Sequence, residues 1–102
     1  MTDSAPDTSS GSIPVCLFSL GELCATPGVL LHVPWEEQMA GLARHAAGDW
    51  GILDEEDRLT NNRSLESGSR LLSAYDSKAG VRFWIITEWD RSYTTFLLPE
   101  EY

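Results

Sequence analysis

The side chains best suited to chemistry near neutral pH are the imidazole of His45 and the carboxylate of Asp49, four residues later. An imidazole can act as a general base near pH 7, and a carboxylate can hold it in the reactive tautomer, as in hydrolases. The sequence offers no Gly-x-Ser-x-Gly motif and no cysteine in an electropositive setting as nucleophile. We therefore expect a charged His45 at the negative end of a helix, with Asp49 capping the next turn.

The two cysteines, Cys16 and Cys24, are eight residues apart in apolar surroundings. We predict buried free thiols, the usual state of cysteine in a reducing cytoplasm. With His32 and His45 they make four potential zinc ligands, but the spacing is irregular and no Cys-x-x-Cys pair is present. We predict neither a metal site nor another cofactor.

The most concentrated charge is an unbroken acidic run from Asp54 to Asp57. Calcium loops alternate their ligands with spacers and bend at a glycine, whereas consecutive acids at a helix start point around its axis. Acidic side chains also favour the positive end of a helix. The run therefore predicts the first turn of a helix, with Asp54 as its N-cap.

The net charge of −9 is unevenly distributed along the 102 residues. Residues 1–57 contain ten acids and one base, Arg44, whereas residues 58–102 contain six of each. This acidic balance excludes a conventional nucleic-acid binder and disfavours binding to an anionic membrane. No stretch approaches the roughly 20 apolar residues of a membrane-spanning helix. The acidic half is suited instead to a basic groove on another protein.

The length predicts a single folded domain over residues 13–102, preceded by a disordered leader over residues 1–12 that is poor in apolar residues. Apolar residues at helical spacing predict helices near 34–47 and 53–67, with Pro34 at the first helical position and Gly48 and Gly68 as the stops. A further turn of helix is expected at 29–32.

The period of the pattern changes from helical to two after Ser69. It predicts three strands over 70–75, 81–89 and 93–98, joined by short turns and therefore antiparallel. The predicted fold is α+β: a three-stranded antiparallel meander with both helices packed on one face. A fourth strand over 15–18 is expected, and whether it joins the sheet is left open.

The four tryptophans supply candidate anchors. Alternation along the central strand puts Trp84 and Trp89 on opposite faces, and we expect Trp89 on the helix side. Trp84 shares its face with charged residues, which favours an exposed protein-contact anchor; partial coverage by the N-terminal strand is the alternative. Trp50 is expected to plug the core.

Several short pieces of residues 16–102 occur in a distinctive order: Ala25-Thr26-Pro27-Gly28, Ala43-Arg44-His45, Gly48-Asp49-Trp50-Gly51, Glu56-Asp57, Arg70-Leu71-Leu72-Ser73-Ala74-Tyr75, Trp84-Ile85-Ile86-Thr87-Glu88, Asp90-Arg91-Ser92 and Thr94-Thr95 through Leu97-Leu98-Pro99-Glu100-Glu101-Tyr102. Together they resemble a family of small proteins carried on bacterial plasmids and integrative elements, often called plasmid-related proteins. The resemblance implies a mobile element and a bacterial cytoplasm, and it implies no activity.

Our leading hypothesis is a non-enzymatic, acidic binding protein of a mobile element that inhibits or modulates a host factor. Anti-CRISPR or anti-restriction action, with DNA mimicry as one mechanism, is the form we expect, and the partner is a protein with a basic surface, such as a nucleic-acid-processing defence complex. Direct binding to nucleic acid or membrane is not expected, and the oligomeric state is left open. The predicted contact residues are Glu36, Glu37, Asp49, Asp54, Glu55, Glu56, Asp57 and Trp84.

Two other functions remain open. One is an accessory or regulatory protein of plasmid maintenance or conjugation; the other, less favoured, is a small hydrolase that uses His45 and Asp49. A contiguous acidic ridge would support the leading hypothesis, scattered acids the accessory protein, and a concave pocket containing His45 the hydrolase.

Titration of the unfolded protein, prepared without reductant or added oxidant, should detect two free thiols per chain. We expect this because neither cysteine is predicted to form a disulfide in a reducing compartment. A value near zero would show that the two cysteines are oxidised.

Overall fold

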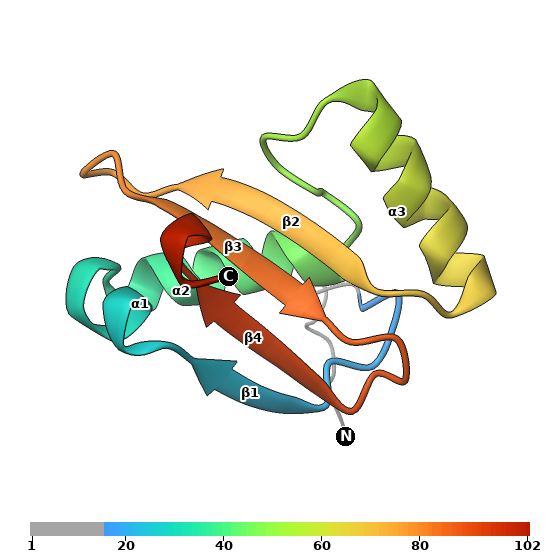
Figure 1. Ribbon diagram of the computed structural model, residues 1–102, viewed down its shortest axis with the longest axis horizontal. Coiled ribbons are helices and arrows are strands. Elements are labelled where there is room, and N and C mark those ends of the chain that lie inside the picture. The colour runs from blue at the N-terminus through green and yellow to red at the C-terminus, as the bar shows by residue number, and fades with distance from the viewer. Residues whose placement is uncertain (1–15) are drawn as a thin grey trace, which may run out of the picture.

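The computed structural model describes residues 16–102, which form an α+β fold (Figure 1). The predicted leader over residues 1–12 lies outside the described residues. The elements in chain order are β1 (Glu22–Ala25), α1 (Pro27–His32), α2 (Trp35–Ala46), α3 (Glu55–Ser67), β2 (Leu71–Asp76), β3 (Arg82–Thr87), β4 (Tyr93–Leu97) and the short 3-10 helix η2 (Pro99–Glu101).

The residues that stop α2 and cap α3 are the ones that the sequence predicts, whereas the start of α2 is shifted by one residue. Pro34 is the N-cap of α2, one position before the predicted one, and Gly48 follows the helix with φ +84°. At the start of α3 the Asp54 carboxylate accepts a hydrogen bond of 2.9 Å from the backbone N–H of Asp57. Gly68 ends α3 in the left-handed conformation that glycine tolerates best.

The sheet has four strands in the order β1-β4-β3-β2 and is mixed. The two antiparallel ladders of the predicted meander are present, between β2 and β3 and between β3 and β4. The fourth strand, β1, lies parallel to β4, so the all-antiparallel three-stranded description was incomplete.

The prediction of a strand over residues 15–18 was wrong within its described part, because residues 16–18 lie in no strand and β1 begins at Glu22. Gly21 sets this start. Its φ is +66°, and a Cβ there would lie 2.3 Å from the carbonyl oxygen of Ser92. The chain can therefore turn closely against β4, and the Glu22 N–H donates to that same oxygen over 3.0 Å. β1 has only four residues and three of them are exposed, so no alternation of buried and exposed residues marks it as a strand.

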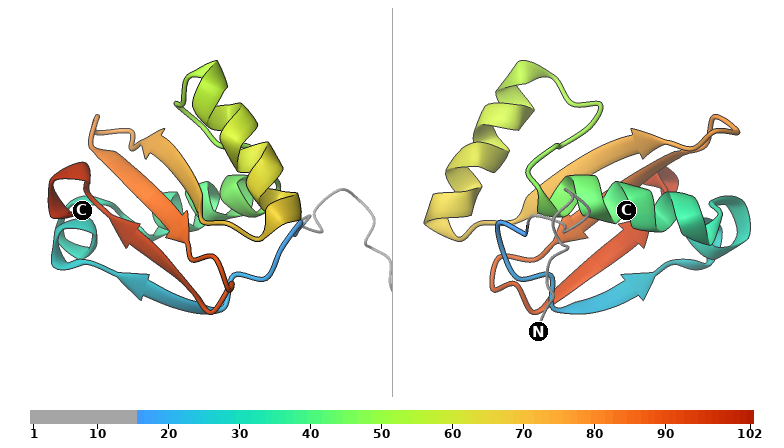
Figure 2. Two further views of the ribbon diagram at one scale, coloured as in Figure 1. Left: turned by 45° about the vertical axis from the view of Figure 1, so that its right-hand side comes forward. Right: turned by 180° about the vertical axis from the view of Figure 1, so that it is seen from behind.

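Only one of the two predicted long helices covers a face of the sheet. α2 lies across one face, whereas α3 lies beyond the edge formed by β2 (Figures 1 and 2). The expectation that both pack on one face was therefore wrong for α3. The reason is its composition: the buried residues of α3 are Asn61 and Ser64, both polar, so it has no apolar stripe to place on a sheet.

The main core lies between α2 and the sheet, around Phe83, Ile85 and Phe96. Gly41 permits the close approach of α2, since a Cβ there would stand 3.2 Å from the Phe83 ring. Trp50 is buried as predicted. Trp89 is not on the helix side, because β3 ends at Thr87 and leaves the Trp89 side chain 67% exposed.

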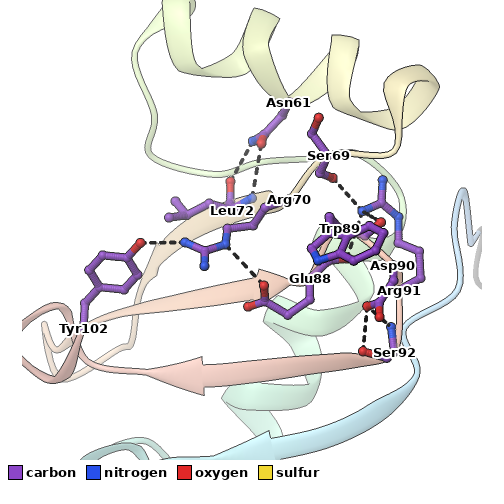
Figure 3. A network of polar contacts seen from close by, with 10 residues as sticks. All are labelled: Asn61, Ser69, Arg70, Leu72, Glu88, Trp89, Asp90, Arg91, Ser92 and Tyr102. Atoms are coloured by element: carbon purple, nitrogen blue, oxygen red, sulfur yellow. Dashed lines mark hydrogen bonds and ion pairs between the residues drawn. The ribbon is translucent and has the colours of Figure 1, made fainter.

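The outer edge of β2 is closed by hydrogen bonds from outside the sheet. The Asn61 side chain donates to the Leu72 carbonyl over 2.6 Å and accepts from the Leu72 N–H over 3.1 Å (Figure 3). Ala74 donates to the Trp50 carbonyl and accepts from the Ile52 N–H. These contacts satisfy groups that would otherwise be a template for another strand.

Replacing Asn61 with alanine should lower the free energy of unfolding by about 1–2 kcal/mol. The change leaves the Leu72 N–H and C=O without partners, which costs about 1–3 kcal/mol, and the higher helix propensity of alanine offsets part of that loss. Arg63→Ala, two residues along the same helix and fully on its exposed side, should change stability by less than about 0.5 kcal/mol. Urea denaturation measures both; equal midpoints for the two variants would contradict the role of Asn61.

Candidate functional site

The acidic run forms one exposed turn at the start of α3, which we call the acidic turn (Asp54–Asp57). Asp54 uses its carboxylate as the helix cap. Within residues 16–102, none of the four carboxylates is in an ion pair. The acidic turn therefore offers uncompensated negative charge to solvent or to a partner.

Two of the other predicted acidic contacts lie elsewhere. Glu36 and Glu37 begin α2, and Glu37 accepts a hydrogen bond of 2.7 Å from the Lys78 N–H. Figure 1 shows the first turns of α2 and α3 well apart, near α1 and beyond the β2 edge respectively. Asp49 accepts two hydrogen bonds from Arg44, at 2.7 and 3.3 Å, which hold its pKa below the ordinary value. The predicted acidic residues thus do not form one ridge.

The sheet face opposite α2 carries a second candidate surface, which we call the outer face (Arg70, Trp84, Glu88, Tyr93 and Tyr102). Figure 1 views this face directly and shows only η2 and the C-terminus folded over part of it. Between these elements the face is hollowed. The lining residues are Arg70, Ile86, Glu88, Tyr93, Thr95, Leu97, Glu101 and Tyr102.

Arg70 organises the polar contacts of the outer face. Its guanidinium donates to the Tyr102 hydroxyl over 2.6 Å and lies 3.5 Å from a carboxylate oxygen of Glu88 (Figure 3). The Arg70 side chain is nevertheless about half exposed, at 46%. A cation and an aromatic hydroxyl are therefore held together within reach of a partner.

Trp84 lies on the outer face as predicted, but it is half-buried rather than exposed. Its ring meets the Tyr102 ring edge-on, with centroids 5.6 Å apart. The aromatic side chains that reach solvent here are Tyr102 and Tyr93, exposed by 70% and 43%. The coverage comes from the C-terminus and not from an N-terminal strand.

Sequence reasoning missed Tyr102 and Arg70 because η2 returns the C-terminus over the sheet. The Glu101 carboxylate holds it there by accepting from the Thr26 hydroxyl at 2.5 Å and from the N–H groups of Gly28 and Leu98 at 2.9 Å. These hydrogen bonds keep the pKa of Glu101 below its ordinary value, and the bond from Thr26 has the largest effect. The one sequence signal was the acidic pair after Pro99, which gives no indication of its distant partners.

A second hollow connects the outer face to the acidic turn. It runs between α3 and β2, and Arg70 borders both hollows. Its lining residues are Leu53, Asp57, Thr60, Asn61, Arg70 and Leu72. The acidic turn and the outer face therefore form one surface that passes over Arg70.

His45 is not at a surface of any kind. It is fully buried, with Nδ1 2.6 Å from the Ser73 hydroxyl and Nε2 2.9 Å from the Thr87 hydroxyl. Thr87 lies 2.7 Å from the Thr94 hydroxyl, which donates to the Leu20 carbonyl over 2.7 Å. Thr94 has one hydrogen, so Thr87 must donate to Thr94, and His45 Nε2–H must donate to Thr87. Because burial and the nearby Arg91 lower the pKa of His45 and keep the imidazole neutral, Nδ1 carries no hydrogen and accepts from the Ser73 hydroxyl.

The expectation of a charged His45 at a helix end was therefore wrong. Burial, reinforced by the positive charge of Arg91, lowers the pKa of His45 to about 3. Asp49 accepts from the Gly51 N–H, as expected for a cap of the next turn, but it pairs with Arg44 rather than His45. The His45–Asp49 pair on which a hydrolase would depend is not formed.

Cys16 and Cys24 are both free, as predicted, and both exposed, contrary to the prediction. Cys24 is exposed because it lies on an edge strand that no helix covers. Among residues 16–102 no group of three or more His, Cys, Asp or Glu side chains is placed to hold a metal ion.

Comparison with protein-family models, curated proteins and solved structures finds no match for this chain. The resemblance to the plasmid-related family therefore stays a prediction. None of the helices within residues 16–102 has the length and apolar character needed to cross a bilayer.

Lowering the pH should destabilise the protein already at pH values well above those at which its carboxylates titrate. The unfolded chain protonates His45 near pH 6.5, whereas the folded chain does so only near pH 3. The stabilising contribution is thus complete above pH 6.5 and is lost as pH falls toward 3, by up to about 1.4 kcal/mol per pH unit. The lowered pKa values of Asp49, Asp76 and Glu101 affect stability mainly below about pH 4.5.

Urea denaturation between pH 7 and 4.5 measures this slope, and His45→Gln should flatten it. Nitrogen NMR of the imidazole provides a check that needs no variant: Nε2 should carry the proton, and the ring should stay neutral at pH 5. A ring that takes up its proton near pH 6.5 in the folded state would contradict this assignment.

Proposed function

We propose that this chain is a non-enzymatic binding protein whose acidic turn and adjoining outer face contact a basic surface of another protein. The observation that carries the proposal is the continuity of the two surfaces over Arg70. One side supplies carboxylates that lack ion-pair partners within residues 16–102. The other supplies exposed tyrosines on a sheet face that no α-helix within residues 16–102 covers.

The division of labour follows from the chemistry of the two surfaces. Exposed like charges speed encounter with an oppositely charged partner but add little affinity once screened by salt. Tyrosines bury large areas at small entropic cost and are frequent anchors of interfaces. We therefore assign capture to the acidic turn, and affinity to Tyr93, Tyr102 and the half-buried Trp84.

The setting that the family resemblance implies is a bacterial mobile element, with the protein acting in the cytoplasm on a host factor. A nucleic-acid-processing defence complex has the basic groove that this surface requires. Because Glu36 and Glu37 lie apart from the acidic turn and Asp49 is paired with Arg44, we place the contact on the acidic turn rather than on a long mimic of the phosphate row. That separation also favours the second candidate, an accessory protein of plasmid maintenance or conjugation, which would use the same surface on an element-encoded partner.

The identity of the partner distinguishes these two candidates. The tagged chain, expressed in a bacterial host that carries the element and defence systems, should retain a protein with a basic surface. Retention of a defence complex supports inhibition of a host factor, and retention of an element-encoded protein supports the accessory role. Naked DNA should not bind at any salt concentration, since phosphate and carboxylate repel each other.

The double variant Glu55→Lys/Glu56→Lys should abolish capture of the partner at low salt. Both side chains are exposed, and Asp54 keeps its capping bond. The matched control is Glu36→Lys/Glu66→Lys, which changes the net charge equally at exposed positions outside the acidic turn and the outer face. Circular dichroism confirms folding, and titration at several salt concentrations measures affinity.

We expect the control to bind within about threefold of the original chain and the original complex to weaken as salt rises. Equal losses in both double variants would assign the effect to net charge alone. Salt-independent binding that survives Glu55→Lys/Glu56→Lys would remove the acidic turn from the interface.

A further inference from the structure

The two edges of the sheet differ in whether other parts of the described chain bind their backbone groups. The β2 edge is closed by Asn61 and by the segment around Gly51. The β1 edge is bare: β1 lies at the margin of the described chain in every view, with no other described element along its outer side (Figures 1 and 2). An edge strand with unpaired backbone groups is a site where another strand can pair.

The hydrogen bonds of β1 show which of its groups are free to pair. The N–H groups of Glu22 and Thr26 donate toward β4, to Ser92 and Phe96, each over 3.0 Å. Alternate residues of a strand direct their backbone groups to opposite sides, so those of Leu23 and Ala25 point away from β4. Within residues 16–102 these outward groups have no backbone partner.

We propose that the β1 edge binds the β1 edge of a second copy of this chain, antiparallel and about a two-fold axis at Cys24. In this register each Leu23 lies opposite Ala25 of the other copy, and each copy donates two backbone hydrogen bonds and accepts two. Glu22 lies opposite Thr26 of the other copy, so no like charges oppose each other directly. The arrangement is closed and isologous, as expected of a symmetric dimer.

The self-complementary register is what favours a second copy over an unrelated strand. Any strand has outward donors and acceptors on both sides of a central residue, but here the exposed Leu23 side chain also meets the small Ala25 rather than its own copy. The pairing joins the two sheets edge to edge and sets the two outer faces side by side. The proposed dimer is independent of the proposed function, and the purified chain alone is enough to test it.

Cys24 provides a direct test of the register. It is exposed and free, and it would face its counterpart in a non-hydrogen-bonded pair with Cα atoms about 4.5 Å apart, within the range that a disulfide spans. Diamide should therefore link Cys16→Ser chains into dimers: two Cys24 thiols form one S–S bond and pass two protons and two electrons to diamide. Cys24→Ser chains, which keep Cys16, should stay largely unlinked under the same conditions.

A second test avoids the disulfide altogether. In a chain with both cysteines replaced by serine, sedimentation equilibrium should detect a weak dimer that strengthens as salt screens the charge of −9 on each copy. Leu23→Pro removes one outward donor from each copy but no bond to β4, and edge strands tolerate proline. It should weaken the dimer about thirtyfold, the equivalent of two hydrogen bonds of about 1 kcal/mol each.

Leu23→Thr is the matched control, since it removes the exposed apolar side chain and keeps the backbone donor; it should retain the dimer within about threefold. A chain that stays monomeric at its highest soluble concentration would overturn the proposal, as would equal dimerisation of the proline and threonine variants. Hydrogen exchange gives a third outcome that would overturn the proposal. If the chain stays monomeric and the outward amides of β1 are protected only when a captured partner is bound, the edge pairs with a strand of that partner and not with a second copy.

Discussion

The buried hydrogen-bond chain that starts at His45 ties together most of this structure. It passes from α2 to β2 through Ser73, to β3 and β4 through Thr87 and Thr94, and ends on the Leu20 carbonyl just before β1. Polar groups in a core are costly unless every donor has an acceptor, and here a single pattern of hydrogens satisfies the chain. That requirement fixes the register of α2 over the sheet.

The segment before β1 depends on the same chain. Thr94 binds the Leu20 carbonyl, and Gly21 then turns closely against Ser92. Because β1 thus begins beside the start of β4, it runs parallel to that strand. The mixed sheet, whose β1 edge has no strand partner within residues 16–102, follows from an interaction in the core. The aromatic rings of Phe18 and Trp50 close over the imidazole and keep water away from it.

α3 is held by polar contacts instead of apolar packing, which explains why its first turn can carry so much charge. Asn61 binds the β2 edge, and the Arg91 guanidinium donates to the carbonyls of Ser64 and Ser69 at the other end of the helix. A cation at that end complements the helix dipole. The acidic turn is thereby held at a fixed place beside the outer face without apolar cover.

The sequence alone determined what depends on neighbouring residues: the α+β class, the caps at Asp54 and Gly68, the positions of the two long helices, the two antiparallel ladders and the side of the sheet on which Trp84 lies. Each follows from local periodicity or turn chemistry. The tertiary structure decided the parallel strand β1, the edge position of α3, the burial of His45 and the return of Tyr102 over the sheet. Those features depend on partners more than ten residues away, such as Thr94 for Leu20 and Thr26 for Glu101, which no local pattern specifies. The exposure of Cys24 was mispredicted for the same reason, because burial depends on which position in the sheet a strand occupies.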